Sequence, residues 1–105
     1  MTQYAIHATH PPNLCPSSNA EIRALMEEAG PQIPTLADKL GVKIVTLNVY
    51  GPEHVVIGVV EADDIETVRD FIVQSRLMQW NTVKVNATWS LDEAMAKVGE
   101  LPTMV

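Results

Sequence analysis

Three side chains able to bind a transition metal lie within nine residues near the start of the chain. They are His7, His10 and Cys15, in the stretch YAIHATHPPNLCPSSNAEI. Neutral imidazole and thiolate are ligands that suit zinc, copper or iron. Prolines at positions 11, 12 and 16 stiffen this segment and reduce the entropy lost when a ligand binds. The three residues are candidate metal ligands, although the spacing H-x2-H-x4-C matches no standard metal motif.

The alternative interpretation of this segment is a proline-ordered loop between a strand and a helix. His7 would then be a hydrogen-bonded histidine on an inner face of the protein. Cys15 precedes a predicted helix start, whose positive end lowers the pKa of a nearby thiol and makes it reactive. An inert, partly buried loop cysteine is the other possibility for this residue.

The composition describes a small acidic protein. A chain of 105 residues has the size of one domain, residues 1–105. Its net charge of −6 repels a phosphate backbone, so we expect no nucleic-acid partner. No apolar run approaches the ~20 residues of a membrane span, and the first residues lack the pattern of an export signal. The single cysteine excludes an internal disulfide, and we expect a cytoplasmic location.

The hydrophobic periodicity predicts the element order β-α-β-β-α-β-α. Strands are predicted at 4–9, 43–50, 54–62 and 82–89. Helices are predicted to begin after capping patterns at Ser18, at Asp63–Asp64 and at Ser90. Pro31 and Pro34 should kink the first helix or divide it into two collinear pieces, and Gly41 should end it.

The alternation of side chains divides the predicted sheet into two faces. The face expected toward the helices carries Tyr4, Ile6, Val45, Leu47, Val49, Val83, Val85 and Ala87. The opposite face carries a polar set, namely His7, Thr46, Asn48, Lys84, Asn86 and Thr88. The third strand is apolar on both sides, which leaves its orientation open and predicts that both faces are covered there. A second copy of the chain is the simplest cover, so we expect a homodimer or higher oligomer that encloses a pocket.

The element order, the length and the polar inner face, over residues 3–98, resemble those of the dimeric α/β-barrel superfamily. The resemblance implies an α+β, ferredoxin-like βαββαβ fold with a C-terminal helix and a four-stranded antiparallel sheet. In that superfamily two sheets face each other and enclose pockets. Its members include cofactor-free quinol monooxygenases, muconolactone isomerases, haem-degrading monooxygenases and small uncharacterised proteins. The resemblance is architectural, so function has to be argued from the site itself.

The first functional hypothesis is a homodimeric protein that binds a small molecule or a transition metal. Its pocket would lie between the sheet face and the loop after the first strand. The residues expected to contact the ligand are His7, Thr46, Asn48, Lys84 and Asn86. His10 and Cys15 would control the mouth of the pocket or complete a metal site with His7.

Two further hypotheses come from other classes of protein. In a small enzyme without an organic cofactor, of monooxygenase or isomerase type, His7 would be the catalytic general base. Lys84 or an asparagine would stabilise the resulting oxyanion. The third hypothesis is a structural or partner-binding dimer. His54, beside Glu53 in the predicted hairpin turn, is interpreted as an exposed residue.

Overall fold

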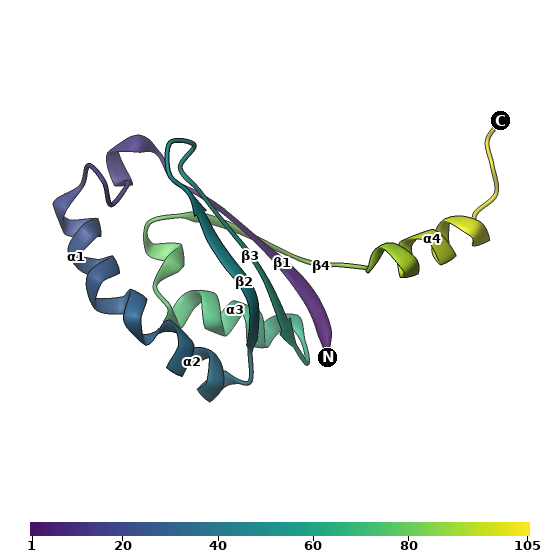
Figure 1. Cartoon of the computed structure of the whole chain (residues 1–105), viewed down its shortest axis with the longest axis horizontal. Helices are drawn as coiled ribbons and strands as arrows, with labels where there is room; N and C mark the ends of the chain where they lie inside the picture. The colour runs from purple at the N-terminus through teal and green to yellow at the C-terminus, as the bar shows by residue number, and fades with distance from the viewer.

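The computed structural model describes all 105 residues and shows helices packed on one face of a four-stranded sheet (Figure 1). The regular elements are β1 (Thr2–Thr9), α1 (Ala20–Ala29), α2 (Ile33–Leu40), β2 (Lys43–Tyr50), β3 (Val55–Ala62), α3 (Ile65–Gln74), β4 (Thr82–Ala87) and α4 (Leu91–Glu100). Short 3-10 turns are η1 (Pro12–Leu14), η2 (Gly30–Gln32) and η3 (Leu77–Gln79). The order of strands and helices predicted from the periodicity is confirmed.

The sheet is antiparallel, with strand order β2-β3-β1-β4. β1 lies in the interior of the sheet, between β3 and β4, and the β2–β3 hairpin forms one edge. This order and pairing agree with the ferredoxin-like arrangement that the resemblance implies. The end of β1 meets the start of β3, because the two strands run in opposite directions. That meeting point positions the candidate site.

The two faces of the sheet differ as the alternation predicts, and the third strand is now oriented. Its residues Val56, Gly58, Val60 and Ala62 are buried on the helix side, and the alternate row Val55, Ile57 and Val59 is half-buried on the open side. A Cβ on Gly58 would lie 2.9 Å from Cδ1 of Leu47 and 3.2 Å from the Thr46 carbonyl oxygen, so a larger residue here would force these neighbours to shift. Val45 differs from the prediction. A register shift between Ile44 and Thr46 displaces it, and 45% of its surface is exposed.

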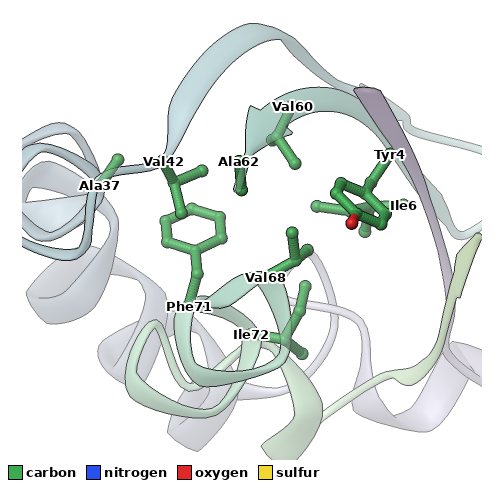
Figure 2. Packing of buried hydrophobic residues seen from close by; sticks show 9 residues of the cluster. All are labelled: Tyr4, Ile6, Ala37, Val42, Val60, Ala62, Val68, Phe71 and Ile72. Atoms are coloured by element: carbon green, nitrogen blue, oxygen red, sulfur yellow. The ribbon is translucent and has the colours of Figure 1, made fainter. Parts of the chain in front are cut away.

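The core lies between the sheet and helices α2 and α3 (Figure 2). Its nine buried residues are Tyr4, Ile6, Ala37, Val42, Val60, Ala62, Val68, Phe71 and Ile72. Phe71 projects from α3 toward Val42, and Val68 lies one turn earlier on the same face (Figure 2). Val68, Phe71 and Ile72 form the inward face of this helix, and Ile65 is only partly buried.

The helix boundaries follow local hydrogen bonding. Asn19, rather than the predicted Ser18, caps α1, because its side-chain oxygen accepts from the Ile22 N–H at 3.0 Å. Asp64 caps α3, and Ser90 begins α4 with a complete capping box. The prolines divide the first helix into α1 and α2 through η2, and Gly41 ends α2 with φ of 78°, both as predicted.

Helix α4 stands away from the rest of the molecule, at the end of the chain that follows β4 (Figure 1). Its apolar residues Leu91, Met95 and Val98 are 77%, 61% and 60% exposed. It extends to Glu100 and includes Gly99. None of the helices combines the length and the apolar character needed to cross a bilayer.

Candidate metal centre

Three potential ligands come together where β1 ends and β3 begins. They are His10, Cys15 and His54, whose ligand atoms all lie within 4.8 Å of one another. His10 follows β1 directly, Cys15 follows η1, and His54 immediately precedes β3. The His10 N–H donates to the His54 carbonyl at 3.2 Å, which extends the β1–β3 pairing by one step. The β1–α1 loop and the β2–β3 hairpin tip therefore lie side by side (Figure 1).

The loop that carries Cys15 is ordered by its own backbone and side chains. The Cys15 N–H donates to the Pro12 carbonyl at 3.3 Å. The Cys15 carbonyl accepts from the N–H groups of Ser18 and Asn19 at 3.0 and 2.8 Å. Pro12 begins η1, where its fixed φ is compatible with the turn and its missing N–H is not needed. The thiol is thus held in place before any ligand arrives.

Two ring nitrogens at this site are buried without a hydrogen-bond partner. They are Nε2 of His10 and Nδ1 of His54. His10 and Cys15 are each only 7% exposed, and His54 is half-buried. Buried polar atoms in folded proteins are paired in roughly 90% of cases, and an unpaired one costs about 1–3 kcal/mol. Two such nitrogens beside one thiol mark a cluster of polar groups that a bound metal ion would satisfy.

A neighbouring amide fixes the tautomer of His10. Nδ1 of His10 lies 2.9 Å from Oδ1 of Asn81, whose amide nitrogen donates to the Leu77 carbonyl at 3.2 Å. That second bond orients the amide with its oxygen toward the ring, so Nδ1 carries the proton and donates it. In the neutral form of the ring, Nε2 then carries the lone pair. A histidine that ligates a metal commonly has its other nitrogen bonded in this way.

Aromatic packing holds the His10 ring from two sides. The ring of Trp80, itself only 6% exposed, lies 5.0 Å away by centroid and is tilted by 50°. The His54 ring lies 5.3 Å away in an edge-to-face arrangement. His54 has φ of 57°, in the left-handed region that histidine occupies more readily than most residues. Both imidazoles are therefore oriented by their surroundings.

The thiol of Cys15 has a lowered pKa. The Ser17 hydroxyl at 2.9 Å from the sulfur stabilises the thiolate most, and a backbone hydrogen bond at Ser17 adds to this effect. Burial opposes the shift, and His54 assists it. A lowered pKa increases the fraction of thiolate at neutral pH, and thiolate is the form that binds metals and attacks electrophiles.

We expect the metal-free protein to show this shift directly. Thiolate absorbance in a pH titration reports Cys15 alone, since the chain has one cysteine. Its midpoint should lie below that of a free cysteine, and Ser17→Ala should raise it. Because the folded pKa is below the unfolded one, the thiolate adds stability above the unfolded pKa, and this is lost as pH falls through the folded pKa. A midpoint unchanged by Ser17→Ala would contradict this assignment.

The three residues line part of a surface pocket of about 380 Å³. Besides the three ligand residues, its walls include Met26 of α1 and Trp80. An ion bound here would have solvent or a small molecule on its outer side. No family model matches the chain, and no curated protein matches its sequence.

The structure does not bring His7 to the other two predicted ligands. His7 is exposed on the open face of the sheet, whereas Ile6 and Ala8 on either side of it are buried toward the helices. His7 and His10 are three residues apart in an extended segment, and an odd spacing places side chains on opposite faces. The triad that the structure assembles has His54 in the place that the sequence analysis gave to His7.

The other predicted contacts gather around His7 and not around the metal ligands. Lys84 is its direct neighbour on β4, and Asn86 lies two residues further along that strand. Thr46 and Asn48 face the same side from β2, since they pair with Val59 and Ile57 of β3. All of these polar side chains are exposed, and none of them lines a pocket in the single chain.

His54 is the site residue that the sequence analysis placed wrongly, as an exposed turn residue. A signal for it was present. The third strand begins beside it, and in the predicted topology that strand starts where the first one ends. A residue at the start of the third strand therefore lies opposite the residue that ends the first. The register confirms this, because Thr9 pairs with Val55 and the next pair outward is His10 and His54.

Proposed function

We propose that this protein binds a transition-metal ion through His10, Cys15 and His54. One observation carries the proposal. Ligand atoms of His10, Cys15 and His54 all lie within 4.8 Å of one another, and each of the two imidazoles has a buried ring nitrogen without a hydrogen-bond partner. The amide of Asn81 supports it, because its hydrogen bond to Nδ1 favours the neutral tautomer in which Nε2 of His10 carries the lone pair. The lowered pKa of Cys15 supports it as well, since binding requires the thiolate.

The donor set favours zinc(II) or copper(I). Thiolate is a soft ligand that selects these ions over magnesium or calcium, and imidazole suits both. In a tetrahedral zinc site with the usual bond lengths, ligand atoms are separated by roughly 3.3–3.7 Å. The ligand atoms lie up to 4.8 Å apart, so binding a tetrahedral ion would require the two loops to move closer by up to about an ångström. Three protein ligands leave the fourth position open, as in catalytic zinc sites.

Titration with cobalt(II) under anaerobic conditions tests the proposal. We expect one ion per chain, with a thiolate-to-cobalt charge-transfer band and the visible bands of tetrahedral cobalt, both displaced by zinc. Trp80 provides a second signal, since its ring adjoins His10 and cobalt quenches nearby fluorescence. A Trp89→Phe background removes the signal of the exposed second tryptophan. Absence of a stoichiometric complex with cobalt, zinc and copper(I) would overturn the proposal.

We further propose that a second copy of the chain covers the open face of the sheet. The half-buried row Val55, Ile57 and Val59 supports this, because no helix of the chain covers that apolar row. The strand order is compatible with the superfamily in which sheets pair face to face. In such a dimer His7 and Lys84 would face an enclosed space, where the predicted small-molecule contacts or general base would operate.

Light scattering measures this association. We expect a mass of twice the 11.5 kDa of one chain, and Ile57→Lys should reduce it to that of a monomer by placing a charge on the covered row. Arg69→Lys, on the exposed surface of α3, serves as the matched control that retains the charge. A monomeric mass for the unaltered chain at high micromolar concentration would contradict the dimer.

A further inference from the structure

Helix α1 covers an apolar cavity without filling it. None of its ten residues is fully buried, although Leu25 and Ala29 lie on the side facing the sheet. A cavity of about 230 Å³ lies beneath the helix, and 11 of its 13 lining residues are hydrophobic. Leu47 and Val56 of the sheet form the opposite wall. A helix whose apolar side stays half-exposed over such a space leaves room for an apolar guest.

The cavity adjoins the pocket at the metal centre. Met26, Val49 and Trp80 line both spaces. Of these shared wall residues, Trp80 lies beside the candidate ligands, because its ring is 5.0 Å from that of His10. A molecule that occupies both spaces therefore has its apolar part under α1 and its other end among His10, Cys15 and His54.

We infer that the protein binds a small apolar molecule that carries one metal-ligating group. The inference rests on the proposed metal site. The ligating group, such as a thiolate or an aromatic nitrogen, would take the fourth position of the ion, which the three protein ligands leave open. The apolar part would fill the cavity under α1. A cavity of about 150 Å³ lined by aliphatic and aromatic side chains can hold benzene. The larger space here accommodates a six-membered ring with a short substituent.

Cobalt-loaded protein and three probes test the inference. Imidazole has the ligating nitrogen alone, toluene has the apolar ring alone, and 4-phenylimidazole has both. We expect 4-phenylimidazole to shift the visible cobalt bands with a Kd at least about tenfold below that of imidazole, because the phenyl ring is buried. Toluene should compete with 4-phenylimidazole without shifting the bands.

Filling the cavity is the matched control. Ala29→Phe should abolish the tenfold advantage of 4-phenylimidazole over imidazole and leave the cobalt bands of the unliganded protein unchanged, which also shows that the variant is folded. Leu25→Phe serves as the second variant on the same wall. Equal Kd values for the two imidazoles would overturn the inference while the metal site stands. If neither imidazole shifted the cobalt bands, the inference would also be overturned. That result would be expected if the Met26 thioether occupied the fourth position of the ion. Failure to load cobalt would overturn both proposals.

Discussion

Replacing His54 with glycine is expected to weaken zinc binding more than about 100-fold, because it removes a direct ligand, and loss of a second-shell partner alone costs about 10–100-fold. Glycine is the appropriate replacement since it accepts the φ of 57° at this position without steric cost. His7→Ala should leave zinc affinity unchanged, because that side chain is exposed on the opposite face of the sheet. Competition with a chromophoric chelator measures both constants.

Asn81 should give an intermediate effect. Asn81→Leu removes the acceptor for the His10 Nδ1–H and should weaken zinc binding by about 10–100-fold. Asn81→Asp keeps an acceptor oxygen at the same place and should retain most of the affinity. The loss of zinc affinity should therefore be largest for His54→Gly and smaller for Asn81→Leu, and His7→Ala should cause none. If His7→Ala lowered zinc affinity as much as His54→Gly, His7 would be a ligand, as the sequence predicted.

Replacing Phe71 with alanine should lower the free energy of unfolding by about 3–5 kcal/mol, as is typical for removing a buried aromatic ring. Phe71 is 2% exposed and joins α3 to the sheet and to Val42 (Figure 2). For a chain of 105 residues such a loss is a large part of the total stability, which is about 5–15 kcal/mol in small proteins. Urea unfolding in the presence of a chelator measures it without a contribution from bound metal.

Val73→Ala is the matched control for this prediction. Val73 lies on the same helix but is 53% exposed, so its loss should change the free energy of unfolding by only about 0.5 kcal/mol or less. An effect of Phe71→Ala as small as that of the control would show that the nine-residue cluster is not the main source of stability.

The strands and the faces of the sheet could be predicted because alternation is a local property of an extended chain. Tyr4 and Ile6 are buried and His7 is exposed, as their parity requires. The orientation of Val45 was predicted wrongly because a β-bulge between Ile44 and Thr46 interrupts the alternation of side chains. No local sequence feature marks this bulge. The cap of α1 was misplaced by one residue, since Ser18 and Asn19 both have capping side chains and the tertiary path of the loop selects Asn19.

The metal centre was only half predictable, since it joins two segments that lie far apart in the sequence. His10 and Cys15 share one loop, and their proximity follows from short spacing and stiff prolines. His54 reaches them through strand pairing, so it becomes visible only after the topology is used to align the start of β3 with the end of β1. The unpaired nitrogens and the role of Asn81 require coordinates.

The detached position of α4 has a consequence for its own folding. A helix of ten residues with no tertiary support is marginal in water, even with a complete capping box at Ser90. The segment should therefore exchange between helix and coil on a timescale much shorter than global unfolding. A partner surface that binds Leu91, Met95 and Val98 would couple its binding to the folding of α4. The affinity of that complex would be reduced by the cost of ordering the segment.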